Sequence, residues 1–100
     1  MLRIEIIKKD NIIKQINFYG HANYADYGKD IVCAAASATM ICTANAIISI
    51  DKSAIEVEQE KNKQTINILK EDIIVDKLIN NMIECFKSLE KQYPKNIEIK

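Results

Sequence analysis

Apolar and polar residues alternate along two stretches near the start of the chain. In the first stretch the alternating apolar residues are Leu2, Ile4 and Ile6. In the second, one face takes every other residue: Ile12, Lys14, Ile16 and Phe18. A period of two is typical of strands with one buried face, so we expect paired strands over 2–9 and 12–19. The turn between them falls on Asp10 and Asn11, residue types that favour turns.

A second alternating pair lies over 54–60 and 64–69, around a turn near Lys61 and Asn62. The inner face of this hairpin is expected to carry Ile55, Val57, Ile66 and Ile68. Its outer face is expected to carry Glu56, Glu58, Thr65 and Asn67. A short alternating stretch over 96–100 ends the chain, so the pattern predicts five strands.

Two further stretches have the length and spacing of helices. Residues 31–50 carry no charge and are rich in alanine, which favours a helix over a strand. This segment is long enough to span a bilayer, but it lacks the leucine content and aromatic ends of a spanning helix. We therefore expect a helix buried on most sides and no membrane partner. The second stretch, 72–92, stops at Pro94 and repeats apolar residues every three or four positions: Val75, Leu78, Ile79, Met82, Ile83, Phe86, Leu89 and Tyr93.

The predicted order is ββ-α-ββ-α-β, an α/β (α+β) fold in two layers. We expect a mixed or antiparallel sheet of about five strands with both helices on one face. At 100 residues the chain fits one domain over 1–100. The first helix has no polar face of its own, so it is expected to be central. The other helix, a loop or a second subunit would cover it, which makes a homodimer a reasonable expectation.

Composition and charge argue against several classes of protein. Apolar residues make up 48% of the chain and charged residues 28%, as in a soluble globular domain. Lys and Arg (14) balance Asp and Glu (14), so direct binding of nucleic acid by phosphate neutralisation is not expected. Three cysteines outside any C-x-x-C pattern argue against a secreted disulfide framework, and the charged N-terminal stretch does not resemble a signal peptide. We therefore expect a cytoplasmic protein.

The residues best suited to chemistry gather in 19–37, which holds the only histidine, both glycines and the first cysteine. His21 follows the second predicted strand, and Cys33 falls in the first turn of the first predicted helix. Rigid elements at both positions can hold the two side chains in a fixed relation. The helix dipole stabilises a nearby thiolate by only about 0.3–1 kcal/mol, too little to activate a thiol. His21 is the only residue that can supply an imidazolium for this purpose.

Asp30 has two candidate roles beside this pair. It is well placed as the N-cap of the helix, with Ile31 as the first helical residue. Its carboxylate could instead turn toward His21 and orient the ring. As a cap, it would oppose ionisation of the Cys33 thiol, so His21 would carry more of the activation.

Ser37 and the two glycines complete the candidate site. Ser37 lies four residues after Cys33 on the same helical face, where its hydroxyl could bond the sulfur, a backbone carbonyl or a substrate. The alanines between them leave room for a peptide. Gly20 ends the strand before the loop 22–29, and Gly28 offers that loop a positive φ angle or a hinge.

These residues also have simpler explanations. Free cysteines are most often buried, and lone loop histidines mostly lie at the surface. We expect Cys42 and Cys85 in the core. Together with His21 and Cys33 they would supply four zinc ligands, but their spacing matches no zinc pattern, so no metal or cofactor is expected. The rival class is a non-catalytic RNA-binding or ribosome-associated module, although the aromatic stacking pairs of such modules are missing from the predicted strands.

A longer pattern runs from Gly20 to Ser37 and has the form GHA-x-Y-x-x-x-G-x-D-I-V-C-A-A-x-S. It resembles the signature of the ribosomal-processing cysteine proteases, a family of small bacterial proteins. The matching residues are Gly20, His21, Ala22, Tyr24, Gly28, Asp30, Ile31, Val32, Cys33, Ala34, Ala35 and Ser37. Ala36 is a departure, because several relatives have valine there. The resemblance extends over the whole chain and the predicted order of elements.

The resemblance implies a cysteine endopeptidase with a Cys-His dyad. By position, Cys33 is the nucleophile, His21 is the general base and acid, and Asp30 and Ser37 support them. The implied substrate is the N-terminal extension of a bacterial large-subunit ribosomal protein, number twenty-seven, whose removal supports ribosome assembly. A homodimer and a mobile loop between His21 and Asp30 are implied as well.

Overall fold

The computed structural model describes residues 1–21, 25–26 and 30–100. Its elements are β1 (Leu2–Lys9), β2 (Ile12–Tyr19), α1 (Ile31–Ile50), β3 (Ile55–Glu60), β4 (Lys63–Ile68), α2 (Ile73–Gln92) and β5 (Ile97–Ile99). The predicted ββ-α-ββ-α-β order and the α+β class are confirmed. The expectations for Ala22, Tyr24 and Gly28 lie outside the described residues.

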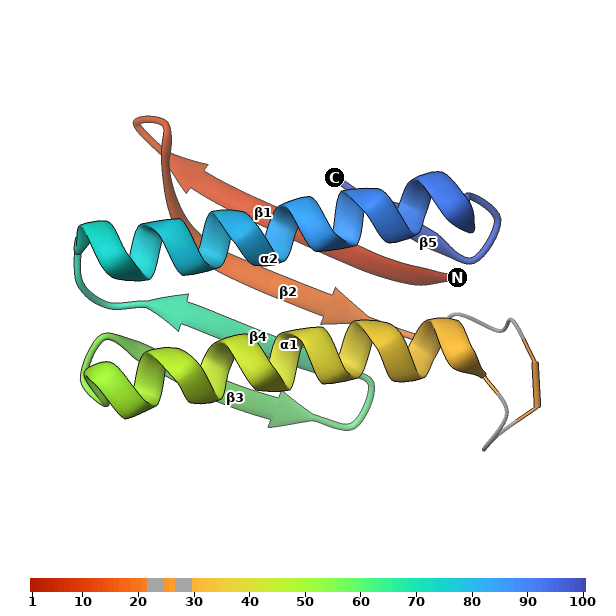
Figure 1. Cartoon of the computed structure of the whole chain (residues 1–100), viewed down its shortest axis with the longest axis horizontal. Helices are drawn as coiled ribbons and strands as arrows, with labels where there is room; N and C mark the ends of the chain where they lie inside the picture. Colours follow the sequence, from red (N-terminus) through yellow and green to blue (C-terminus); the bar gives the residue numbers. More distant parts are fainter. Residues whose placement is uncertain (22–24, 27–29) are drawn as a thin grey trace.

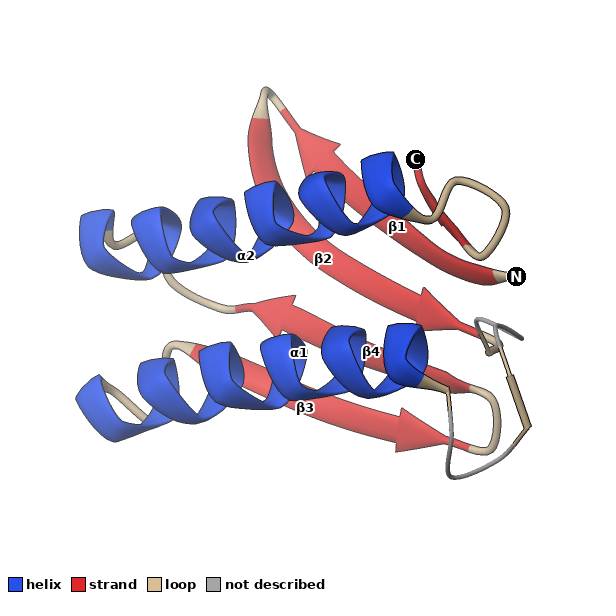
Figure 2. Ribbon diagram, turned by 45° about the vertical axis from the view of Figure 1, so that its right-hand side comes forward, coloured by secondary structure: helices blue, strands red, loops and turns tan. Residues whose placement is uncertain are grey.

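The strands form one mixed sheet in the order β3-β4-β2-β1-β5. Neighbouring strands are antiparallel except β1 and β5, which run parallel. Both helices lie on the same face, α1 over the β3–β4 side and α2 over the β1–β2 side (Figures 1 and 2). The sheet therefore has one covered face, one uncovered face and two edges, formed by β3 and β5.

The core lies between the two helices and the covered face of the sheet. The predicted apolar stripe of α2 is confirmed, with its buried members being Val75, Ile79, Met82, Ile83 and Phe86. The ring of Phe86 meets that of Phe18 edge-on, with centroids 5.5 Å apart. The strands add the buried side chains of Leu2, Ile4, Ile13, Ile16, Phe18, Ile55, Ile66 and Ile97.

The buried face of β2 changes partway along the strand. In the pairing of β1 with β2, Lys14 is an extra residue that has no partner, which defines a β-bulge. An inserted residue moves the side chains beyond it to the opposite face of the sheet. The predicted face is therefore wrong at its start, since Ile13 is buried while Ile12 is 37% exposed.

The uncovered face carries polar side chains joined by hydrogen bonds. Thr65 Oγ1 donates to Asn17 Oδ1 at 2.8 Å, and Asn17 Nδ2 donates to Glu5 Oε1 at 3.1 Å and Gln15 Oε1 at 3.0 Å. Thr65 lies on the outer face as predicted, but these neighbours bury it together with Asn17. A polar network thus shields the middle of the face that no helix covers.

α1 is less buried than its composition predicts. Its buried residues form one stripe: Val32, Ala36, Met40, Ala44 and Ile47. Ile31, Ile41 and Ile50 are 55%, 51% and 58% exposed. Since α1 lies beside α2 rather than beneath it, the expectation of a central helix buried on most sides is wrong for the single chain. Among the described helices, α1 alone is long and apolar enough to cross a membrane by length and composition, a test that core helices of soluble proteins also pass.

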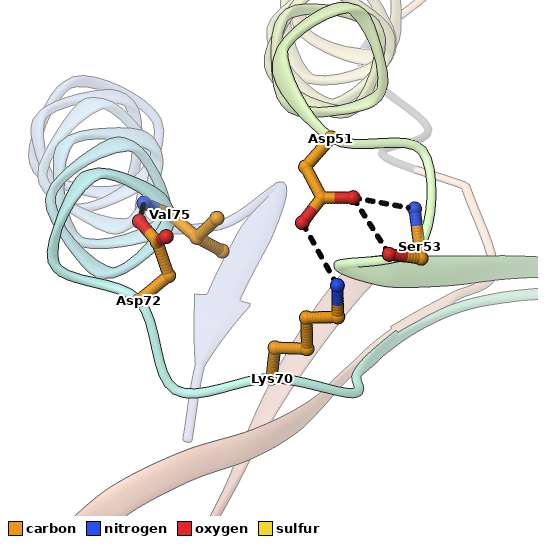
Figure 3. Close-up of polar contacts among 5 residues, drawn as sticks. All are labelled: Asp51, Ser53, Lys70, Asp72 and Val75. Carbon is orange, nitrogen blue, oxygen red and sulfur yellow. Dashed lines mark hydrogen bonds and ion pairs between the residues drawn. The ribbon is translucent and has the colours of Figure 1, made fainter.

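The C-terminal end of α1 is tied to the connection that precedes α2. The Asp51 carboxylate accepts hydrogen bonds from Ser53 Oγ at 2.6 Å, Ser53 N at 3.0 Å and Lys70 Nζ at 3.1 Å (Figure 3). The two bonds from Ser53, and then Lys70, lower the pKa of Asp51 from 3.8 to about 2. Nearby, Asp72 caps α2 by accepting from Val75 N at 3.2 Å (Figure 3). Local polar contacts therefore fix the chain at this end of the molecule.

Candidate active site

Cys33 lies in the first turn of α1, as predicted. Asp30 is the N-cap of this helix, and its Oδ1 accepts from Cys33 N at 2.9 Å. The Asp30 carbonyl accepts from Ala34 N at 3.0 Å, which closes the first turn. Of the two roles considered for Asp30, the structure shows the capping role. The Cys33 side chain packs against the core but remains partly exposed, as a reactive thiol requires.

The end of β2 presents His21, whose side chain is exposed. Gly20 has a φ of +75°, a conformation that glycine adopts without strain. A Cβ at this position would lie 3.1 Å from the carbonyl oxygen of Met1. The Gly20 N–H donates to the Asn62 carbonyl at 3.2 Å, which anchors the strand end to the β3–β4 turn. These contacts set the direction in which the chain leaves β2 and so place His21.

A cleft with a volume of about 710 Å³ brings the candidate residues together. Its lining includes Gly20, His21, Asp30, Cys33 and Ser37. The end of β2, the first turns of α1 and the β3–β4 turn form its walls. The described candidates from two separate elements therefore share one solvent-accessible space.

Small side chains make room for a peptide on the helix side of the cleft. Ser37 is exposed to the cleft one helical turn after Cys33, as predicted. Ala34 and Ala36 also line the cleft, and Ala36 is buried. The departure from the family pattern at Ala36 therefore lies at the base of the cleft and enlarges it relative to valine.

The opposite wall comes from the β3–β4 hairpin, which the sequence did not indicate as part of the site. Gln59 and Gln64 pair across these strands, and both line the cleft. They continue the inner face that Val57 and Ile66 begin, so this face changes from apolar to amide side chains where it meets the cleft. The sequence signal for this wall was the presence of two glutamines at positions where the alternation favours apolar residues. Only the strand pairing shows that they lie across from Cys33.

The other two cysteines do not belong to the site. Cys42 and Cys85 are both exposed, so the expectation that they lie in the core is wrong. Each falls outside the buried stripe of its helix. Within the described residues no three His, Cys, Asp or Glu side chains form a group that could hold a metal ion, and the four-ligand zinc set is not assembled there.

The family model described as cysteine protease Prp matches residues 1–98. This chain belongs to the cysteine protease Prp family. Its reaction class is peptide-bond hydrolysis by a cysteine nucleophile, which decides against the interpretation as a non-catalytic module. The resemblance noted over 20–37 is confirmed at the level of the family.

Known members of the Prp family match the chain over nearly its full length. The ribosomal processing cysteine protease Prp of Staphylococcus aureus is 27% identical over 103 residues, which cover 99% of this chain and 97% of that protein.

Solved structures also share the fold. The S. aureus protease Prp with a covalently linked product peptide superimposes with a TM-score of 0.92 at 24% identity, covering 99% of this chain and 97% of that one. The same protease with a substrate peptide gives a TM-score of 0.87 at 24% identity, covering 100% and 98%. SMU.848 from Streptococcus mutans gives 0.79 at 22% identity, covering 100% and 92%. At these identities the comparison establishes the fold.

Proposed function

We propose that this protein is the endopeptidase that removes the N-terminal extension of large-subunit ribosomal protein number twenty-seven in its own bacterium. The observation that carries the proposal is the cleft, which both the partly exposed Cys33 and the exposed His21 line in a chain of the Prp family. The S. aureus relative is named a ribosomal processing protease. Removal of the extension would support ribosome assembly and would take place in the cytoplasm.

The proposed mechanism uses a dyad of Cys33 and His21. His21 accepts the thiol proton, and the thiolate attacks the scissile carbonyl carbon. The imidazolium then protonates the leaving amine, which frees the C-terminal product and leaves a thioester on Cys33. Water, deprotonated by His21, hydrolyses the thioester and restores the thiol.

Backbone amides at the start of α1 are the candidates to stabilise the oxyanion. The Cys33 N–H already donates to Asp30 Oδ1, so it is not a free donor in this conformation. Ile31 and Val32 supply the other N–H groups of the first turn. Asp30 therefore acts as a positioning residue that fixes the first turn, while Ser37 lines the cleft, where its hydroxyl can bond the substrate.

Cleavage of a peptide that spans the N-terminal junction of the ribosomal protein from the same organism tests this proposal. We expect cleavage by the wild type, none by Cys33→Ala or Cys33→Ser, and a loss of at least about 100-fold in His21→Ala. Cys42→Ala is the matched control, because it removes an exposed thiol from the same helix. Equal cleavage by Cys33→Ala and the wild type would exclude the dyad.

The outward face of α1 supports a second part of the proposal, a homodimer. This face is uncharged, and its exposed members include Ile31 and Cys42. Packing it against the same face of a second copy would bury apolar surface that the single chain leaves in water. Light scattering should give twice the chain mass of 11.4 kDa, and Cys42→Arg should lower it toward one chain. A wild type that is monomeric at all concentrations would rule out the dimer without affecting the dyad.

A further inference from the structure

One edge of the sheet reaches the catalytic cleft with its backbone unpaired. β3 is the outermost strand, and within the part of the chain that the structure describes no other strand pairs with its free side. Gln59 and Glu60, at the end of β3, line the cleft. Unpaired N–H and C=O groups on a strand edge are a template for another extended segment.

The hydrogen bonds of the β3–β4 hairpin show which backbone groups are free. Leu69 N donates to the Ala54 carbonyl at 2.8 Å, so this pair occupies a hydrogen-bonded position of the ladder. Hydrogen-bonded and non-hydrogen-bonded pairs alternate in antiparallel strands, so the even-numbered residues of β3 direct their backbone groups toward β4. The N–H and C=O groups of Ile55, Val57 and Gln59 therefore point to the open edge.

α1 presents exposed apolar side chains along the same edge. Cys33 and Ser37 line the cleft, and residues four apart share one flank of a helix, so Ile41 continues this line and Ile48 follows two turns later. Ile41 is 51% exposed and Ile48 is 40% exposed. Figures 1 and 2 show α1 and β3 running in opposite directions side by side. Because the cleft lies at the first turns of α1 and the end of β3, α1 leads away from it and β3 leads toward it.

Because Ser37 and Gln59 both line the cleft, equal steps from these two residues bring Ile41 and Val57 to about the same level. A helix rises about 1.5 Å per residue and a strand about 3.3 Å, so the step from Ser37 to Ile41 matches the step from Gln59 back to Val57. Val57 is on the inner face, opposite the buried Ile66, yet it is 42% exposed because it belongs to the edge strand. We call Ile41, Ile48 and Val57 the apolar track, which continues from the cleft along the β3 edge.

The outer face of β3 has the opposite character. Glu56, Glu58 and Glu60 all lie on it and are exposed. Lys63, the partner of Glu60, lies over the ring of Tyr19 at 5.4 Å from its centroid. Successive side chains of an added strand would point alternately to the apolar track and to this row of carboxylates. Lysine or arginine fits the positions of the added strand that face the carboxylates, and acidic residues are repelled there.

The geometry points to β3 as the substrate-binding strand. A peptide that crosses Cys33 continues along Val57 and Gln59 as a sixth strand, with alternate apolar side chains on the apolar track and basic side chains beside the glutamates. The inference rests on the proposed function of the cleft in cutting peptides, and it defines the substrate class as an extended segment of alternating apolar and basic residues beside the scissile bond. Pairing with a fixed edge would also hold the scissile bond in register with the nucleophile.

Binding of designed peptides to the full-length Cys33→Ala protein tests this inference. The probes are three heptapeptides: alternating leucine and lysine, alternating leucine and glutamate, and the leucine and lysine residues grouped in two blocks. We expect the alternating leucine–lysine peptide to bind at least about tenfold more tightly than the other two. It should slow amide hydrogen exchange at Val57 and Gln59 and leave the β5 edge unchanged. Equal affinities, or protection that misses β3, would overturn the inference.

Two variants separate the backbone and charge contributions. Val57→Pro removes an edge N–H that β4 does not use, and proline is tolerated at such positions. It should weaken binding of the leucine–lysine peptide at least about tenfold. Glu58→Lys should instead shift the preference toward the leucine–glutamate peptide. Glu98→Lys makes the same charge change on β5 at the opposite edge and should leave both affinities unchanged.

Circular dichroism establishes whether each variant is folded. If Val57→Pro does not fold, the peptide preference of Glu58→Lys tests whether β3 binds the substrate. A folded Glu58→Lys protein with an unchanged preference would reject the inference. The probes are not taken from a ribosomal protein, so their binding does not depend on which substrate is cut. If the ribosomal peptide is not cleaved, the proposed substrate is rejected. If the designed peptides do not bind as expected, the role of β3 as the substrate-binding strand is rejected.

Discussion

The two helices have the same length of 20 residues and lie side by side on one face of the sheet, but their surfaces differ. In α2 most apolar residues form one buried stripe and polar residues occupy most of the remaining surface, although Ile73 and Ile74 in the first turn are exposed. In α1 no residue is charged, and Ile31 and Ile41 remain more than half exposed. The fold accounts for the sequence of α2, whereas α1 has more apolar surface than the chain buries.

The difference indicates that folding of the single chain does not account for every feature of α1. A helix on a sheet needs one apolar stripe for stability, and α1 has this stripe from Val32 to Ile47. Its N-terminal turn carries Cys33, its cleft flank continues to Ile41, and its outward face is uncharged. We attribute the first of these features to catalysis, the second to binding of the substrate and the third to contact with a second subunit.

The largest effect expected from this comparison is on stability. Phe86→Ala removes a fully buried ring from α2 and should lower the free energy of unfolding by about 3–5 kcal/mol. Ile41→Ala removes an exposed side chain from α1 and should change it by less than about 0.5 kcal/mol. Urea unfolding of the two variants measures both values. A loss for Ile41→Ala comparable to that for Phe86→Ala would show that the flank of α1 is needed for folding.

Thiol reactivity sharpens the comparison at the level of single side chains. Cys33 lies at the start of α1 in the cleft with His21, whereas Cys42 and Cys85 are exposed outside it. Although it is less exposed than Cys85, Cys33 should react with iodoacetamide at neutral pH about tenfold faster than Cys85, which lies outside both the cleft and the proposed dimer face. His21→Ala should remove most of this difference. Mass spectrometry of tryptic peptides measures the rates, and equal rates for the three thiols would argue against an activated nucleophile.

The smallest effect concerns the end of α1 that lies away from the cleft. The pKa of Asp51 is lowered to about 2, first by the Ser53 hydrogen bonds and then by Lys70. A folded-state pKa below the unfolded value means that ionised Asp51 stabilises the fold above about pH 4, and that this contribution is lost as the pH falls toward about 2. The thermal midpoints of Asp51→Asn and the wild type should therefore differ most at neutral pH and converge in acid. Because the carboxylate is exposed to solvent, the difference should be small, and curves that stay parallel would contradict it.

The local parts of the site could be predicted because they depend on residues close together in the chain. Asp30 and Cys33 are three residues apart, so an N-cap at Asp30 places the thiol in the first helical turn whatever the rest of the fold does. The position of His21 at the end of β2 follows in the same way from the alternation of that strand. The family signature lies within this segment, so the resemblance can be found in the sequence without knowledge of the fold.

Strand pairing determined the hairpin wall of the cleft and the buried face of β2. Gln59 and Gln64 face Cys33 only because β3 and β4 form the wall beneath α1, and no short spacing in the sequence encodes that approach. The bulge at Lys14 arises from the count of residues in two paired strands, so the alternation of β2 alone gave the wrong buried face.

Hydrophobic period and capping are properties of a few consecutive residues, so the amino-acid sequence by itself determined the elements, their order and the place of the nucleophile in the first turn. The exposure of a side chain depends instead on which distant segments of the chain pack against it. The tertiary structure therefore decided that Cys42 and Cys85 lie at the surface, that α1 keeps apolar residues in contact with water, and that the free edge of β3 ends beside Cys33. These features depend on contacts between segments far apart in the chain, and their free energy is gained only when the whole sheet and both helices come together.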